Sequence, residues 1–366
     1  MYDSSIVGQD RLISYLTRVV GGDRMPHAML FFGPDGVGKV AAALETAKAL
    51  HCERPEGGAC GDCSQCRKLA EGNHPDFSVL FPIRKKPRAK DIDPVEEREG
   101  LQKILQDPYF HPIPEDSVIL PIDLVRRLRN RFGLGTFEGA WRTAVIVHAE
   151  RMRPEAANAL LKTLEEPPPN SLIILLALEQ NAILPTIVSR CQAIKFQPLS
   201  TQDVVSWLRQ RYEMADDQAL FVARASGGSL RRARDLAEGD AAESQGRAVR
   251  FLQALVSDNL PQTYLALEQL AADRSGALNL LADAELWLRD ALLYSQSGME
   301  LAAHQGNEED IRDLCGVLTP EAVEALARRI EAIREMNRRN VSTNLALMSL
   351  WREARRVSKR PSAPPA

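Results

Sequence analysis

Uninterrupted hydrophobic runs mark the first half of the chain. Those at 28–32, 143–147 and 171–178 are almost wholly apolar. Such runs are typical of strands in a parallel sheet, because helices bury both faces of that sheet. Segments rich in helix formers alternate with these strands, at 5–24, 41–50, 122–131 and 154–166. The alternation predicts an α/β domain over residues 1–198.

After Leu199 the pattern changes from runs to helical periodicity. Apolar residues recur three and four positions apart, and Gly227-Gly228 interrupts them. We therefore predict a small helical lid domain at 199–240 and an all-α domain at 243–357. Residues 358–366 are rich in proline and small residues, which indicates a disordered tail.

The segment 82–114 differs from its surroundings because it is rich in proline and charge. It contains a basic cluster, made of Arg84, Lys85, Lys86, Arg88 and Lys90. We interpret the segment as an exposed, charged insertion. A solvated loop is the simpler interpretation, and a contact with DNA or a partner is the alternative.

The composition narrows the class of protein. The chain has 366 residues, 45% hydrophobic and 26% charged, with a net charge of −3. These values fit a globular protein and argue against one that coats nucleic acid by bulk charge. We find no signal peptide and no apolar run long enough for a membrane span, so we expect a cytoplasmic protein without membrane contact.

The loop after the first predicted strand has the glycine spacing of a phosphate-binding loop. The pattern is G-x-x-x-x-G-K followed by Ser or Thr, and its glycines let backbone N–H groups surround phosphate. The residues that fit are Gly33, Gly36, Gly38 and Lys39. Val40 stands where a hydroxyl would hold Mg²⁺, and valine offers no oxygen ligand.

A second defect lies at the end of the predicted strand 143–147. An active ATPase usually carries acidic residues there, to hold Mg²⁺ and orient water. This chain has Val147 and His148, and Glu150 follows too late. Two defects at one Mg²⁺ site predict that ATP is not hydrolysed. Two alternatives stay open: the loop binds a nucleotide without hydrolysing it, or His148 acts as a catalytic base.

Cysteine and arginine motifs supply further candidate chemistry. Cys52, Cys60, Cys63 and Cys66 have the spacing C-x7-C-x2-C-x2-C, which suits a closed, structural Zn²⁺ site; four unliganded thiols are the alternative. Arg190, within Ser189-Arg190-Cys191, is either a salt-bridge partner or an arginine finger. A finger stabilises negative charge on the γ-phosphate of a neighbouring subunit.

Taken together, these motifs resemble the bacterial clamp loader family, the AAA+ subunits of DNA polymerase III. The resemblance covers roughly residues 4–240. Besides the phosphate loop and the cysteines, it is carried by Ile6–Gln9, Pro26–Ala28, Ala157–Pro168, Ser189–Cys191 and Gly228–Arg231. It implies an AAA+ domain with a zinc module at 52–66, followed by a lid and a helical collar.

Within that family the chain resembles the delta-prime type of subunit rather than the gamma/tau ATPase. Val40, His148 and the mismatched Leu178-Glu179 at the γ-phosphate sensor position carry this distinction. The resemblance implies a hetero-pentamer with gamma/tau and delta subunits, which loads a sliding clamp on primed DNA. It also implies structural zinc, a vestigial phosphate loop, and Arg190 as a finger acting in trans.

Other positions keep two interpretations. Arg231 occupies the second sensor position of the family, or forms a structural salt bridge. Asn344, Leu345, Leu347 and Leu350 fit a collar helix, although ordinary core packing explains them equally well. The alternatives for the whole protein are a gamma/tau-like ATPase with a degenerate but working site, and a zinc-stabilised DNA-binding protein that acts alone.

Overall fold

The structure is a computed structural model in two compact units. One comprises Met1–Arg211 with Ser226–Arg234, and the other comprises Tyr212–Ala225 with Asp235–Ala366. We describe the following residues: 6–22, 25–55, 57–84, 94–109, 118–238, 241–257, 259–272, 274–298, 302, 307–338 and 343–357. The predicted tail at 358–366 and the basic residues 85–90 lie outside them.

A five-stranded parallel sheet forms the centre of the first unit. Its strand order is β2 (Phe77–Leu80), β5 (Arg142–Ile146), β6 (Ser171–Ala177), β1 (Ala28–Phe32) and β7 (Gln192–Lys195). Every residue of β5 and β6 is buried, as expected for inner strands covered on both faces. The predicted parallel α/β class is thereby confirmed.

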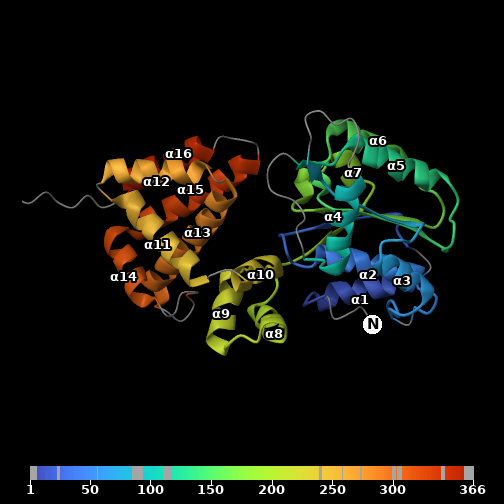
Figure 1. Cartoon of the computed structure of the whole chain (residues 1–366), viewed down its shortest axis with the longest axis horizontal. Helices are drawn as coiled ribbons and strands as arrows, with labels where there is room; N and C mark the ends of the chain where they lie inside the picture. Colours follow the sequence, from blue (N-terminus) through green and yellow to red (C-terminus); the bar gives the residue numbers. More distant parts are fainter. Residues whose placement is uncertain are drawn as a thin grey trace, which may run out of the picture. The chain divides into compact units, whose positions relative to one another are not determined.

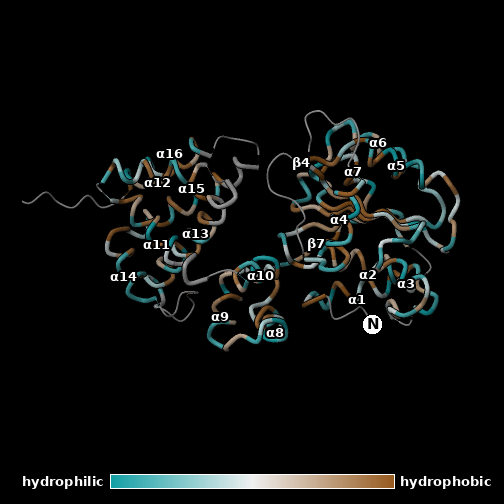
Figure 2. Tube along the Cα trace, in the orientation of Figure 1, coloured by the Kyte–Doolittle hydropathy of each residue, from teal (hydrophilic) through white to brown (hydrophobic). Residues whose placement is uncertain are grey.

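Helices cover the two faces of this sheet (Figure 1). Helices α1 (Asp10–Val20) and α2 (Lys39–His51) lie on one face, and α5 (Ile122–Gly133) and α6 (Pro154–Glu165) lie on the other. The apolar sides of α5 and α6 pack with the strands into one core, in which Leu128 and Leu160 are almost fully buried. Figure 2 shows the inner strands as mostly hydrophobic and α5 as largely hydrophilic.

The predicted insertion contains regular structure. Helix α4 (Pro94–Gln106) buries Ile104, and strands β3 (Ile83–Arg84) and β4 (Val118–Ile119) form a small antiparallel pair. Gly100 of α4 lies so close to the Phe81 ring that a Cβ would be 2.5 Å from it. The interpretation as a loop was therefore wrong for α4, because apolar residues at helical spacing outweigh the surrounding charge, although most of the helix is exposed as expected.

Shorter elements complete the connections of the first unit. They are α3 (Ser64–Ala70), η1 (Ala149–Arg151), η2 (Gln180–Ala182) and α7 (Pro185–Val188). The region predicted as a lid contains α8 (Thr201–Tyr212), α9 (Asp216–Ala225) and α10 (Leu230–Glu238), which are divided between the two units. A separate lid domain at 199–240 stays a prediction.

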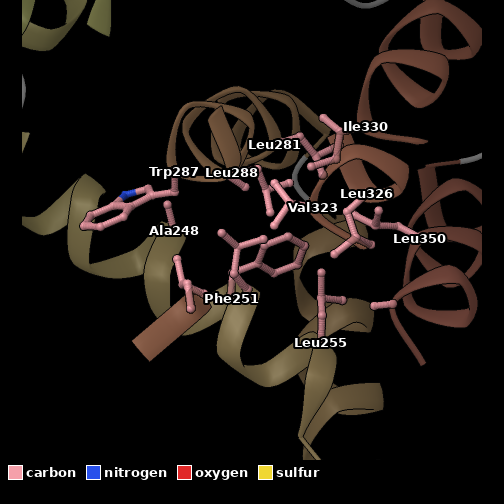
Figure 3. Close-up of a cluster of buried hydrophobic side chains, with 14 of the residues drawn as sticks. Ala248, Phe251, Leu255, Leu281, Trp287, Leu288, Val323, Leu326, Ile330 and Leu350 are labelled. Atoms are coloured by element: carbon pink, nitrogen blue, oxygen red, sulfur yellow. The ribbon is translucent and has the colours of Figure 1, made fainter. Parts of the chain in front are cut away.

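The second unit is helical beyond residue 240. Its helices are α11 (Ala241–Val256), α12 (Leu260–Ala272), α13 (Arg274–Ser297), α14 (Glu308–Val317), α15 (Pro320–Arg338) and α16 (Thr343–Val357). Figure 3 shows part of their common core, to which Trp287 of α13, Phe251 of α11 and Leu350 of α16 all contribute. Leu347 is also buried, but Leu345 is 68% exposed, so it is not part of this core.

Among the helices of the described residues, we find none with the length and apolarity that a membrane crossing requires.

Candidate functional site

The phosphate loop connects β1 to α2, and close backbone contacts explain its glycines. Gly33 has φ of 148°, and a Cβ there would be 2.4 Å from the carbonyl oxygen of Phe196. Gly38 precedes the helix in the left-handed region, with φ of 96°. Residues with side chains rarely adopt these conformations. The sequence Gly33–Val40 therefore folds into the strand–loop–helix arrangement that its pattern predicts.

Lys39 lies inside this loop and is bonded to it. The Lys39 side chain donates from Nζ to the carbonyl oxygens of Gly33, at 2.7 Å, and Pro34, at 2.5 Å. The residue is only 8% exposed. Burial lowers the pKa of Lys39 to about 8, although the charges of Asp35 and Glu150 act to raise it. The cation that would reach a phosphate is thus engaged by the backbone of its own loop.

The start of α10 packs against the same loop. The backbone N–H of Leu230 donates to the carbonyl oxygen of Gly36 at 2.9 Å. A Cβ at Gly36 would be 2.2 Å from Ser229 Oγ, so only glycine fits there. Arg231 forms an ion pair with Asp35. The salt-bridge interpretation of Arg231 is therefore the one that the structure shows.

A turn after α4 covers the other side of the loop. The hydroxyl of Tyr109 lies 3.2 Å from the position of a Cβ at Gly38, and its ring meets Trp207 edge to face. Burial raises the pKa of Tyr109 to about 12. Asp107 Oδ2 forms an ion pair with Arg234 Nη1 of α10 at 2.9 Å. Sequence reasoning missed this turn because the prolines and charges of the insertion suggested a loop.

Beyond β5, the chain turns at His148, whose φ of 51° is left-handed. His148 Nδ1 lies 2.9 Å from Glu150 Oε1, while Glu150 Oε2 is buried without a hydrogen-bond partner among the described residues. Burial acts to raise the pKa of Glu150, but the hydrogen bond and charge of His148, a backbone hydrogen bond and the charge of Arg151 together outweigh it, and the pKa is lowered. A buried carboxylate is thus present, although not at the predicted acidic positions.

Arg190 presents a different environment from Lys39. Its Nη1 donates to the carbonyl oxygen of Thr186 at 2.8 Å and to Ser189 Oγ at 3.2 Å. Its Nη2 forms a 2.8 Å ion pair with Glu165 Oε1, at the end of α6. The side chains of Arg190 and Glu165 are 35% and 48% exposed, respectively. The guanidinium group is therefore ordered and still open to solvent.

The four predicted metal ligands converge on one point. The Sγ atoms of Cys52, Cys60, Cys63 and Cys66 all lie within 4.8 Å of one another. Tetrahedral zinc–thiolate bonds of about 2.3 Å require sulfur separations of about 3.8 Å, so the cluster fits Zn²⁺. Backbone N–H groups of Cys60, Cys63 and Cys66 donate to neighbouring sulfurs at 3.3–3.4 Å, as suits thiolates.

A buried polar network joins the cysteine segment to β5, which no sequence motif indicated. His51 Nε2 lies 2.9 Å from Thr143 Oγ1, and the His51 ring meets the His74 ring edge to face. Asp76 accepts from three consecutive backbone N–H groups of 137–139 and from Arg142. Burial lowers the pKa of His51 to about 4. Both rings have protein partners, since His51 contacts Thr143 and His74 Nε2 lies 2.6 Å from Gln65 Oε1, so the network has a structural role.

The fold and the site define the class of protein: a P-loop α/β protein in which Lys39 is bonded to the backbone of its own phosphate loop. A family model described as "DNA polymerase III, delta subunit" matches residues 8–200. The chain therefore belongs to this family of DNA polymerase III clamp loader subunits, and the relatives below place it with the delta-prime type.

Curated relatives agree with the family model. The DNA polymerase III subunit delta' of Pseudomonas aeruginosa is 30% identical over 331 residues, covering 89% of this chain and 91% of that protein. The delta' subunit of Bacillus subtilis is 29% identical over 250 residues, covering 68% of this chain and 65% of that protein. The tau subunit of B. subtilis is 25% identical and covers 81% of this chain.

Among solved structures, a DNA polymerase III gamma subunit-related protein from Thermotoga maritima covers 94% of this chain. Its sequence identity is 17% and its TM-score is 0.37. A TM-score of that size does not by itself establish a shared fold.

Proposed function

We propose that this protein is a non-hydrolysing subunit of the DNA polymerase III clamp loader, which supplies Arg190 to the ATP of a neighbouring subunit. The contrast between two cations carries the proposal. Lys39 is buried and bonded to its own loop, whereas the guanidinium group of Arg190 remains at the surface. Only the second cation is available to a partner.

The chemistry of the phosphate loop supports the first part of the proposal. Val40 supplies no oxygen to Mg²⁺, and Gly36 and Gly38 are covered by Ser229 and Tyr109. Without a bound metal ion, little would neutralise the charge that develops on a transferring phosphoryl group. The loop then serves as structure, and bound ATP, if any, is not hydrolysed.

Arg190 supports the second part. A guanidinium group is planar, always charged and able to bind phosphate oxygens with two parallel N–H bonds. An arginine supplied in trans is worth 10³–10⁵ in the rate of phosphoryl transfer in well-studied cases. The partners that follow are gamma/tau ATPase subunits and a delta subunit in a hetero-pentamer. That assembly would load a sliding clamp on primed DNA, with residues 243–357 as the subunit-joining collar.

The four cysteines would hold a structural Zn²⁺. With four thiolates bound, the ion has no open position for substrate, so it would stabilise the fold around α3 rather than take part in catalysis. Metal analysis after purification in reducing, chelator-free buffer should give about one zinc per chain. Cys60→Ser should lower that ratio, and a wild-type protein without zinc would contradict the site.

The proposal is tested with Arg190→Ala in the reconstituted loader. We expect the complex to assemble normally, as measured by size-exclusion chromatography. At the ATP site of the neighbouring subunit that Arg190 would contact, here called the served site, the rate of hydrolysis should fall on the order of 10³-fold. DNA-stimulated turnover of the whole complex should fall less, because other ATP sites do not use Arg190. Arg126→Ala removes a surface arginine of α5 that is paired with Asp123, outside the proposed collar, and is the matched control. Normal hydrolysis in the Arg190→Ala complex would refute the proposal.

One observation favours a second candidate, a gamma/tau-like ATPase with a degenerate but working site. The charge of the buried Glu150 carboxylate reaches Lys39 and opposes the lowering of its pKa by burial, so a carboxylate and a lysine remain together at the loop. The rate of ATP hydrolysis by the isolated chain distinguishes the two candidates. Steady ATP turnover that Lys39→Ala abolishes would favour the second candidate, and no turnover would favour the first.

A further inference from the structure

Glu165 is the acidic residue that faces the proposed finger. It is the last residue of α6, which packs against α7, the short helix that leads to Arg190. Its Oε1 atom forms an ion pair with Nη2 of Arg190 at 2.8 Å, while the carbonyl oxygen of Thr186 accepts a hydrogen bond from Nη1 at 2.8 Å. Contacts from two separate segments therefore fix the plane of one guanidinium group.

Fixing that plane affects binding in a neighbouring site. A free arginine side chain has many rotamers, and holding one of them for a phosphate costs conformational entropy. An arginine that is already ordered avoids much of this cost when the transition state forms. In the described part of the chain, the contacts of Arg190 use three of the five N–H donors of a guanidinium group, so the fork keeps donors for phosphate.

The exposure of the pair indicates that it is not held for the sake of folding. Both side chains are more than one-third exposed, and ion pairs in water contribute little to stability. A doubly charged phosphate competes well with a solvated carboxylate for the same guanidinium group. The ion pair can thus order Arg190 before the neighbouring ATP binds, and it can dissociate when a phosphate group takes the place of Glu165.

We propose that Glu165 is a positioning residue for Arg190, which orients the guanidinium group toward the neighbouring ATP. This inference rests on the proposed function of Arg190. The bond, not the negative charge, is what matters: Glu165→Gln keeps an oxygen acceptor at the same place, whereas Glu165→Ala removes it.

The test uses the reconstituted loader on DNA, with rapid-mixing kinetics that separate hydrolysis at the neighbouring ATP site served by Arg190 from hydrolysis at the other sites. Glu165→Ala should lower kcat at the served site about tenfold, with KM for ATP within about twofold, as expected when order is lost but binding is not. Glu165→Gln should restore the wild-type rate. Glu166→Ala changes the net charge equally at the next residue and should have no effect.

Arg190→Ala, measured in parallel, separates the two proposals. A loss with Arg190→Ala but an unchanged rate with Glu165→Ala would overturn the role of Glu165 and leave the finger intact. A raised rate with Glu165→Ala, or an equal loss with Glu165→Gln, would also overturn it. An unchanged rate with Arg190→Ala would refute the finger itself, whatever the Glu165 variants do.

Discussion

Lys39 and Arg190 are both cations of nucleotide-site motifs, yet they have opposite environments. Lys39 is 8% exposed and donates to carbonyl oxygens within its own loop, whereas the Arg190 side chain is 35% exposed and pairs with a half-exposed carboxylate. Neutral carbonyl oxygens from nearby in the sequence make Lys39 part of the fold. A solvated ion pair leaves Arg190 able to change partners. Burial and choice of partner thus distinguish a retained structural cation from an available one.

The largest effect on stability should come from the residue that covers the loop. Tyr109→Ala removes a buried ring from between Gly38 and Trp207, and should lower the free energy of unfolding by about 3 kcal/mol. Urea denaturation measures it. Tyr109→Phe keeps the ring and should cost less than about 1 kcal/mol. If Tyr109→Ala and Tyr109→Phe both left the free energy of unfolding almost unchanged, Tyr109 would not hold the phosphate loop closed.

A pH series examines the burial of Lys39. Because its pKa falls from 10.5 to about 8 on folding, the unfolded chain binds more protons between those values. The contribution of Lys39 to stability should therefore rise as pH increases from about 8 to about 10.5, by up to about 3 kcal/mol. The difference in unfolding free energy between wild type and Lys39→Met isolates it. If the curves of unfolding free energy against pH were parallel for wild type and Lys39→Met, Lys39 would lie in solvent. Lys68→Met is the control for a surface lysine.

The ion pair between Arg231 and Asp35 should have a smaller effect. Its side chains are 26% and 41% exposed, so Arg231→Ala should cost less than about 1 kcal/mol. The difference from wild type should shrink in about 1 M salt, because salt screens exposed charges. A larger, salt-independent loss would show that Arg231 closes the loop mainly by packing.

The smallest effect should be that of Arg190→Ala on folding. An exposed ion pair and two surface hydrogen bonds should change the unfolding free energy by no more than about 0.5 kcal/mol. Thermal unfolding of the isolated chain checks this value. A loss above about 2 kcal/mol would remove the contrast with Lys39, since Arg190 would then be structural as well.

The sequence predicted the inner strands well, for a physical reason. The run predicted at 28–32 is β1, and the run predicted at 143–147 is β5 within one residue, because strands buried on both faces carry unbroken apolar runs. Strand β7 was missed because it is an edge strand, and most of its residues are exposed. Its sequence, Gln192–Lys195, has no apolar run to reveal it.

The candidate site was predictable only where a motif fixes local geometry. The glycine spacing gave the loop, and the cysteine spacing gave four sulfurs that meet, although zinc itself stays a prediction. The partners of these groups come from distant parts of the chain. Tyr109 reaches Gly38, and Glu165 reaches Arg190, through tertiary packing that single-sequence patterns do not encode.

The phosphate loop also affects how nucleotides are counted. With Lys39 bonded to Gly33 and Pro34, ATP at this loop would meet a lysine that already donates to the backbone. In the proposed role, a complete loader should hydrolyse ATP at fewer sites than there are phosphate loops in the ring. This chain would then be a silent member in the measured stoichiometry of turnover, whether or not its loop holds a nucleotide.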